Sequence, residues 1–142
     1  MSTRLDLVKT LLQGIRDDER RYDTLRPLLE EQRLCMIRRD SEALLTVNDA
    51  IQQQYEQLSL SSQQRRLVLQ SLEVDVNRTG IERVFNWLPA PQKSTAHSWW
   101  QNLEQKAERC KTYNEKNGDL LIRQYEFIQS FLGSEVDFIY HR

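Results

Sequence analysis

Apolar side chains recur at alternating steps of three and four residues along most of this chain. That spacing places them on one side of an α-helix, because about 3.6 residues complete a turn. The longest run lies in the last third of the chain, where ten positions form one seam: Trp100, Leu103, Ala107, Cys110, Asn114, Asn117, Leu121, Gln124, Ile128 and Phe131. Asn114 and Asn117 stand where a simple coiled coil would have leucine. Polar groups there weaken the packing and fix the register, so the seam predicts a helical bundle that presents a helix to a partner.

Helix-breaking residues are scarce, because the chain has only four glycines and three prolines. No strand-like alternation interrupts the helical period. Four helices are therefore predicted, at about 3–38, 41–77, 79–88 and 95–132. Asp40 is the predicted N-cap of the second helix, and Gly133 follows the end of the last one.

Long helices of similar length with short connections pack antiparallel. The predicted fold is therefore all-α: an elongated antiparallel bundle of three long helices plus one short helix, within residues 1–133. Residues 134–142 break the heptad and are predicted to form a flexible C-terminal tail. The last predicted helix, at about 95–132, would be a rod of about 55 Å.

Two positions leave local alternatives. Pro27 coincides with a change of phase in the first helix, which predicts a kink between Tyr22 and Pro27, or two helices that meet there. Gly118 lies inside the last helix, where glycine costs about 1 kcal/mol relative to alanine. The seam keeps its phase on both sides of Gly118, so we predict a continuous helix in which this glycine allows the close approach of a neighbour.

A second apolar column lies beside the seam of the last helix. Trp99, Tyr113, Leu120 and Phe127 share one heptad position, which only Lys106 interrupts. A stripe of this width contacts two neighbouring helices. Either both neighbours belong to the bundle, or the part between Leu120 and Phe131 is left for an external amphipathic helix.

Length and charge limit the possible classes of protein. The 142 residues suit one domain, and the formal net charge of −1 gives no electrostatic basis for binding nucleic acid. The N-terminal residues lack the apolar core of a secretory signal, and no apolar run approaches the roughly 18 residues of a membrane span. Cys35 and Cys110 fall at apolar positions of the predicted helices. We therefore predict that both are buried free thiols in a reducing compartment. We therefore expect a cytoplasmic protein without membrane insertion.

Residues with catalytic or metal-binding chemistry are few. His97 and His141 are the only histidines, and no metal-ligand cluster or nucleophile motif surrounds them. The acidic run 17–19 is predicted to be a solvated face with interleaved arginines. Trp87 and the pair 99–100 are predicted to fill one end of the bundle as a plug. This role is favoured over a role in a partner interface. We expect no enzymatic activity, no catalytic residues, no cofactor and no metal.

Three stretches between Leu28 and Gly133 resemble the FlgN family of flagellar export chaperones. The stretch 28–45 is similar to the family's first helical hairpin, and Gln63-Gln64-Arg65-Arg66-Leu67 lies late in the second helix. The third stretch has the pattern Asn114-x-x-Asn117-Gly118-x-Leu120-Leu121, which is similar to part of the family's last helix. The short helix bounded by prolines and the Trp99-Trp100 pair depart from the simplest family pattern.

This resemblance implies a chaperone for hook-associated (hook–filament junction) proteins. Such a chaperone binds the amphipathic C-terminal helix of its client, prevents premature assembly and delivers the client to the flagellar export gate. The implied partner-binding residues are Asn114, Asn117, Leu120, Leu121, Gln124, Phe127, Ile128 and Phe131. Export chaperones also use a tyrosine near the C-terminus to dock on the gate, and Tyr140 is the candidate here; the alternative is an ordinary tail residue.

The same wide stripe allows a second hypothesis. A coiled-coil structural or adaptor protein would cover its own seams by self-association, for instance as an antiparallel dimer. A monomer that binds a client helix distinguishes the chaperone from this alternative.

Overall fold

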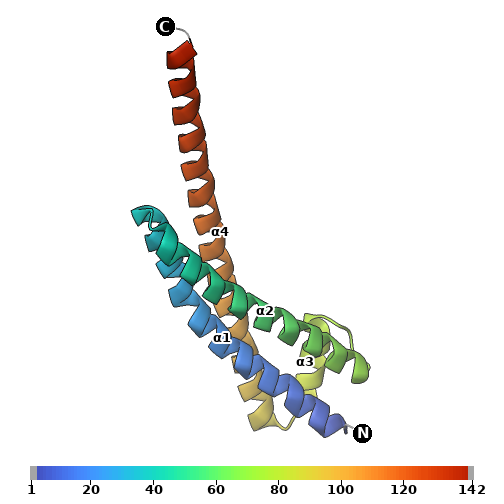
Figure 1. Cartoon of the computed structure of the whole chain (residues 1–142). Coiled ribbons are helices and arrows are strands. Elements are labelled where there is room, and N and C mark those ends of the chain that lie inside the picture. Colours follow the sequence, from blue (N-terminus) through green and yellow to red (C-terminus); the bar gives the residue numbers. More distant parts are fainter. Residues whose placement is uncertain (1–2, 141–142) are drawn as a thin grey trace.

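The computed structural model describes residues 3–140 of the chain, with side chains described through residue 130. It contains four α-helices in the order α1 (Arg4–Arg38), α2 (Ser41–Ser71), α3 (Arg78–Asn86) and α4 (Ala90–Tyr140). The three long helices, α1, α2 and α4, are packed together, and α3 is short (Figure 1). The predicted fold class is therefore confirmed.

Helix α1 packs against both α2 and α4. After a tight turn α2 returns antiparallel to α1, and α4 then runs in the same direction as α1 (Figure 1). Hydrogen bonds join α1 and α4 at offsets of 83 to 88 residues, among them those from Lys106 to Asp23, from Asn117 to Leu29 and from Gln124 to Met36. Because the offset is nearly constant and α1 ends at Arg38, α4 extends past the α1–α2 turn (Figure 1).

Helix α1 is one continuous helix through Pro27, so the alternative of two separate helices is wrong. Thr3 and Asp6 form a capping box at its start, in which each side chain accepts a hydrogen bond from the other residue's backbone N–H. Pro27 lies on the exposed side. Water can satisfy the carbonyl that loses its amide partner there, which lowers the cost of a proline inside the helix.

The turn between α1 and α2 begins at Arg39, which adopts a left-handed conformation with φ of 55°. The N–H of Asp40 donates to the carbonyl oxygen of Cys35 over 3.0 Å and closes the helix end. The Asp40 side chain then accepts from the N–H of Ala43 over 3.1 Å, so Asp40 is the N-cap of α2 as predicted.

Helix α2 ends at Ser71, earlier than the predicted end near Asn77. Glu73 takes a left-handed φ of 58°, and the N–H of Val74 donates to the carbonyl of Leu69 over 3.2 Å. This arrangement ends a helix, but its left-handed residue is usually glycine, so a glutamate at this position does not signal a helix end. Asn77 is instead the N-cap of α3, which places the start of α3 slightly before the predicted residue 79.

Helix α3 lies against α4 near its start (Figure 1). Gly80 permits the chain to fold back closely before it, because a Cβ atom at Gly80 would lie 1.7 Å from the carbonyl oxygen of Asp75. The apolar side of α3 is buried through Ile81, Val84 and Phe85.

Helix α4 is longer than predicted at both ends. It begins at Ala90, before the predicted start near residue 95, because Pro91 falls in the first turn, where a missing N–H costs no helical hydrogen bond. At the other end the backbone of residues 133–140 is helical, where a helix end and a tail were predicted. No proline occurs after residue 91 to interrupt the backbone hydrogen bonds.

The helix also continues through Gly118, which confirms the prediction drawn from the phase of the seam. The predicted close approach at Gly118 is wrong. A Cβ atom built there would meet nothing within 4 Å, because this residue faces solvent. The glycine therefore has no packing role among the described residues.

Two groups of buried side chains hold the bundle together. The larger group, near the chain start and α3, consists of Val8, Leu11, Ile15, Val68, Leu69, Leu72, Ile81, Val84, Phe85, Ala96 and Leu103. The smaller group lies nearer the α1–α2 turn and consists of Leu25, Leu29, Ile51, Leu58 and Cys110. The apolar core thus becomes thinner toward the end of the bundle where α4 leaves its neighbours.

A buried carboxylate lies between these two groups along α1. The Asp18 side chain is 4 % exposed and forms ion pairs with Arg65 of α2 and with Arg21, the latter over 2.7 Å. The hydroxyl of Ser61, also on α2, donates to it over 2.9 Å. One carboxylate thereby binds two groups of the neighbouring helix and ties α1 to α2.

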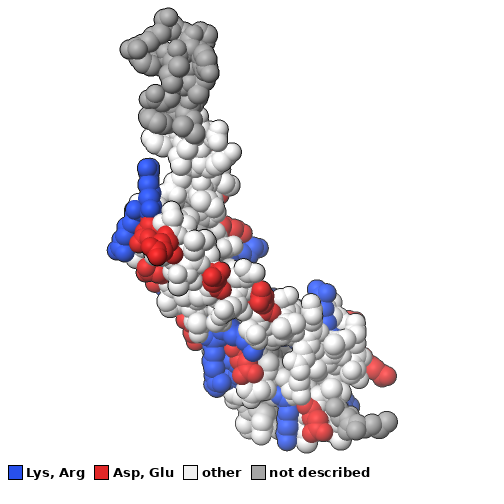
Figure 2. All heavy atoms as spheres, in the orientation of Figure 1, with Lys and Arg blue, Asp and Glu red and all other residues white. Residues whose placement is uncertain are grey.

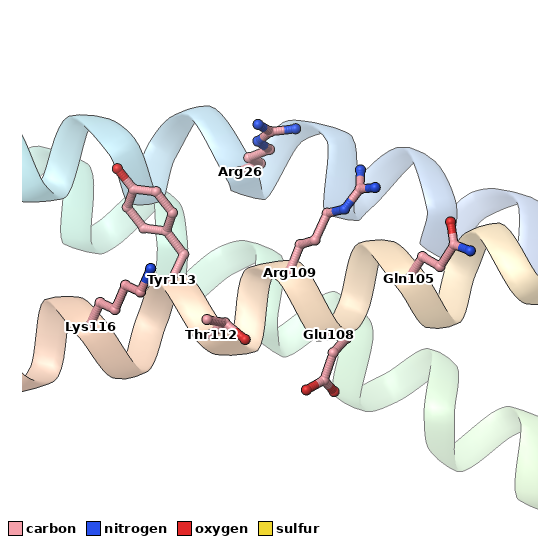
Figure 3. Close-up of a pocket in the computed structure, with 7 residues that line it drawn as sticks. All are labelled: Arg26, Gln105, Glu108, Arg109, Thr112, Tyr113 and Lys116. Atoms are coloured by element: carbon pink, nitrogen blue, oxygen red, sulfur yellow. The ribbon is translucent and has the colours of Figure 1, made fainter.

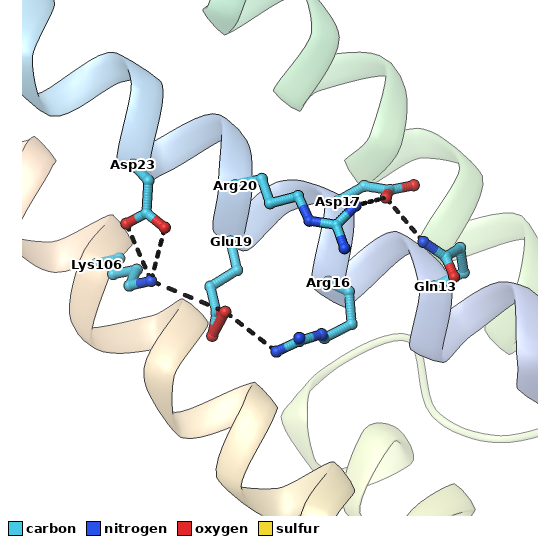
Figure 4. A network of polar contacts seen from close by, with 7 residues as sticks. All are labelled: Gln13, Arg16, Asp17, Glu19, Arg20, Asp23 and Lys106. Carbon is cyan, nitrogen blue, oxygen red and sulfur yellow. Dashed lines mark hydrogen bonds and ion pairs between the residues drawn. The ribbon is translucent and has the colours of Figure 1, made fainter.

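Two further carboxylates of α1, Glu19 and Asp23, pair with a residue of α4. Glu19 is buried and accepts from Arg16, while the ammonium of Lys106 on α4 lies 3.8 Å from Glu19 and 2.9 Å from Asp23 (Figure 4). Only Asp17 agrees with the predicted solvated face, since Asp18 and Glu19 are buried. The prediction was wrong for these two because each also has a partner on another helix, Arg65 of α2 for Asp18 and Lys106 of α4 for Glu19.

Replacing Asp18 by alanine should destabilise the protein by about 3 kcal/mol, because Arg65 would keep its half-buried position without a counter-ion. Asp17→Ala is the matched control, since the Asp17–Arg20 pair is largely exposed, and it should cost less than about 1 kcal/mol. Urea unfolding followed by circular dichroism measures both. Equal losses for the two variants would contradict a structural role for the buried pair.

Candidate partner-binding surface

The part of α4 that passes the α1–α2 turn exposes a run of large apolar side chains. Residues 120–128 contain six apolar or aromatic residues among nine, and we call them the apolar segment. Five of these side chains are between 47 and 62 % exposed: Leu121, Ile122, Tyr125, Phe127 and Ile128. Figure 2 shows this part of the molecule as a mostly uncharged surface next to the undescribed end.

These side chains lie on several sides of the helix, and the exposed residues Arg123 and Glu126 occupy the remaining side. Leu121, Tyr125 and Ile128 lie on one side, Leu120 and Phe127 on a second, and Ile122 on a third, as the turn of about 100° per residue requires. An apolar stripe on a helix is normally covered by a neighbour, and this segment has apolar side chains beyond a single stripe. Exposed apolar areas of this kind mark interaction sites.

The sequence prediction missed Ile122 and Tyr125 because they lie outside both apolar columns. The signal that would have found them is the density of apolar residues between 120 and 128, regardless of period. Only the structure shows that this dense stretch has no neighbour among the described residues on several sides.

A groove lies where the apolar segment passes the α1–α2 turn. Its volume is about 230 Å³, and it is bordered by Cys35, Met36, Arg39, Asp40, Ser41 and Leu44 on one side and by Leu121, Gln124 and Ile128 on the other. The apolar side chains of both sides face one shared space. This groove is large enough for one or two side chains of a partner.

Asn117 is buried, and both the nitrogen and the oxygen of its side-chain amide form hydrogen bonds within the protein. Its amide nitrogen donates to the carbonyl of Leu29 over 2.8 Å and to the side-chain oxygen of Gln32 over 2.9 Å. Its amide oxygen accepts from Arg33 over 3.4 Å. All of these partners lie on α1, so Asn117 fixes the position of α4 against α1.

The other predicted site residues lie in different surroundings. Asn114 is exposed, and Leu120 is half-buried. Gln124 is half-buried and donates to the carbonyl of Met36 over 2.9 Å, near the end of α1. The side chains of Phe131 and Tyr140 lie outside the described residues. The structure thus brings Leu121, Gln124 and Ile128 together in one groove, and places Phe127 elsewhere on the helix.

A second, wider groove of about 480 Å³ lies between α1 and α4. Arg26 enters it from α1, and α4 contributes Gln105, Glu108, Arg109, Thr112, Tyr113 and Lys116 (Figure 3). In this view α2 lies behind α1 and α4, so the groove opens on the side away from α2. Its rim has three cations and one carboxylate.

The thiols and His97 do not form a reactive centre. Cys35 and Cys110 are buried and free, as predicted, and burial raises the pKa of both thiols, which disfavours the reactive thiolate. His97 packs edge-on against Phe85 with ring centres 5.1 Å apart. Among the described residues no group of three or more His, Cys, Asp or Glu side chains could hold a metal ion.

The tryptophans pack at the end of the bundle near α3. Trp99 and Trp100 contact the larger buried group, in agreement with the predicted plug, whereas Trp87 is 37 % exposed and is not part of it. Each of the three indole rings lies under an arginine, in the pairs Arg4–Trp87, Arg16–Trp99 and Arg65–Trp100, with 3.5 to 5.7 Å between guanidinium carbon and ring centre. The indole N–H of Trp100 is buried and has no hydrogen-bond partner among the described residues.

Within the described chain, no helix combines the length and the hydrophobicity that crossing a bilayer requires. A small helical bundle that exposes apolar side chains on several sides of one helix segment belongs to the class of helical binding proteins. The family model described as FlgN protein matches residues 1–133. The chain therefore belongs to the FlgN family, whose members are flagellar export chaperones for hook-associated proteins and are not enzymes. Neither the comparison with curated proteins nor that with solved structures found a match.

Asn117→Ala should lower the free energy of unfolding by about 1–3 kcal/mol, because the buried acceptors on α1 would lose their donor. Asn114→Ala is the matched control, since its side chain is exposed, and stability should change by less than about 0.5 kcal/mol. Thermal unfolding of the two variants beside the parent chain provides the measurement. A neutral Asn117→Ala would show that these hydrogen bonds do not hold α4 in place.

Proposed function

We propose that this chain is a cytoplasmic chaperone that binds the amphipathic C-terminal helix of a hook-associated protein along the apolar segment. It keeps this helix from premature assembly and delivers the client to the flagellar export gate. The single observation that carries the proposal is the exposure of an apolar segment on several sides of α4. A client helix with its own apolar stripe would cover it.

The groove beside the α1–α2 turn supports this proposal. Leu121 and Ile128 border it together with Leu44 of α2, so a client side chain inserted there would contact three helices. Leu120 and Phe127 offer a second contact line on the same helix. Within the predicted set, Asn117 serves to hold α4 on α1, and Asn114 lies one turn before the apolar segment.

The proposal also accounts for the polar residues near the site. A client must be released at the export gate, so its binding has to be reversible. Gln124 uses its amide to hold the last turn of α1 and adds no apolar area. A site with a polar group at its centre binds less tightly and more selectively than an all-leucine one.

Leu121→Asp combined with Ile128→Asp should weaken binding of a peptide with the C-terminal sequence of a hook-associated protein about tenfold or more. The matched control is Leu60→Asp with Leu67→Asp on α2, which introduces the same charges at two exposed leucines with the same seven-residue spacing. Fluorescence anisotropy measures the affinities, and circular dichroism checks that both variants fold. Failure of the parent chain to bind at tens of micromolar, or equal affinities for both variants, contradicts the proposal.

Sedimentation of the free chain tests the alternative, a self-associating coiled-coil structural or adaptor protein. That alternative requires a tight dimer, which Leu121→Asp with Ile128→Asp dissociates.

We further propose that Tyr140, at the end of α4, docks on the cytoplasmic domain of the export gate. Its support is the resemblance to export chaperones and its position beyond the apolar segment. Tyr140→Ala should leave client-peptide affinity unchanged and reduce capture of the gate domain in a pull-down. Tyr125→Ala, within the apolar segment, should do the reverse. Gate capture by Tyr140→Ala at the parental level would refute this role.

A further inference from the structure

A stripe of cations accompanies the apolar residues of α4. Three exposed basic residues recur at seven-residue spacing: Arg109, Lys116 and Arg123. Each has an aromatic or apolar residue four positions later: Tyr113, Leu120 and Phe127. Residues four apart are neighbours on a helix surface, so the six side chains form one line in which basic and apolar groups alternate. We call this line the basic stripe.

The first half of the basic stripe forms one wall of the wide groove between α1 and α4. Arg109, Tyr113 and Lys116 all line this groove, and Arg26 faces them from α1 (Figure 3). By its register on α4, the second half leads from the groove to Leu120 and Phe127 in the apolar segment. A helix seated in this groove would lie on the side away from α2 and would complete a four-helix arrangement with α1, α2 and α4.

The cations of the stripe are not neutralised by the described part of the chain. None of Arg109, Lys116 and Arg123 lies within 4 Å of a described carboxylate, whereas Arg65 and Lys106 are held by carboxylates of α1. The chain as a whole has a net charge of −1. The rim of the wide groove thus has three cations, Arg26, Arg109 and Lys116, against the single carboxylate of Glu108, which favours a partner of opposite charge.

We propose that the client helix lies along the basic stripe and carries acidic residues at seven-residue spacing on one flank of its apolar stripe. The inference rests on the proposed function and specifies the chemistry of its partner. The stripe from Arg109 to Phe127 would match about five turns of client helix, or roughly 27 Å. The apolar side chains of the client cover Tyr113, Leu120 and Phe127, and its carboxylates pair with the three cations.

The charge of the stripe argues against a second copy of this chain as its occupant. Two basic stripes laid against each other would bring cations of both copies together, and like charges across an interface oppose association. The occupant is therefore an acidic helix from another protein.

Two synthetic amphipathic peptides test this inference. Both share one apolar stripe; the first has glutamate and the second lysine on the same flank. The glutamate peptide should bind about tenfold or more tightly than the lysine peptide in about 50 mM salt, and the difference should shrink in about 500 mM salt, because exposed charges are screened. Equal affinities in low salt would overturn the inference.

Charge reversal on the protein locates the effect. The variant Arg109→Glu/Lys116→Glu/Arg123→Glu should lose the preference for the glutamate peptide or invert it. The matched control Lys9→Glu/Arg66→Glu/Arg83→Glu changes the same total charge at three exposed cations on α1, α2 and α3, and should keep the preference. Circular dichroism verifies that both variants fold. If both variants lose the preference equally, the effect comes from net charge and the stripe is not the site.

The outcomes separate this inference from the proposed function. If both peptides bind equally and Leu121→Asp/Ile128→Asp abolishes their binding, the proposed function stands and the basic stripe has no part in it. If neither these peptides nor the client peptide binds, both proposals fail. A dimer in sedimentation that the charge-reversal variant dissociates would make a second copy the occupant and overturn the inference.

Discussion

The parallel register between α1 and α4 is the constraint on which the rest of the structure depends. Polar contacts from Lys106, Cys110, Asn117 and Gln124 to α1 all connect residues 83 to 88 positions apart. Since α1 ends at Arg38, this offset leaves α4 without the support of α1 just beyond Gln124. The exposed apolar segment is a direct consequence of the register. A shift by one helical turn would bury different residues at the α1–α2 turn.

The interactions that hold this register change along the bundle. Near α3, burial of large apolar side chains such as Phe85 and Ile15 dominates, and each contributes about 1.5–3 kcal/mol. Toward the α1–α2 turn, α4 is attached by the amides of Asn117 and Gln124, and a typical hydrogen bond has a net value of about 1 kcal/mol. These amides need specific acceptors, so they define the register with little apolar area. The leucines and aromatic residues of this region therefore remain free for another molecule.

Membership of the FlgN family offers a reason for the exposed apolar residues of α4. An exposed apolar helix is a liability for a protein that acts alone, because it promotes aggregation. In the chaperone that we propose, the same surface would bind the client helix. The buried Asp18 pair and the ion pairs of Lys106 keep the other end of the bundle in one arrangement, so the free segment is displayed from a fixed base.

The sequence by itself determined the elements whose signals are local. Apolar periodicity identified four helices, Asp40 marked a cap, and the unbroken phase across Gly118 showed one continuous helix, since each depends on residues within a few turns. The tertiary structure alone decided that Asp18 and Glu19 are buried, that Asn117 faces α1, and that Ile122 and Tyr125 are exposed. Their partners, or the lack of them among the described residues, depend on chain segments more than forty residues away. Periodicity gives the side of a helix on which a residue lies, and the neighbours on that side are set by how the helices pack.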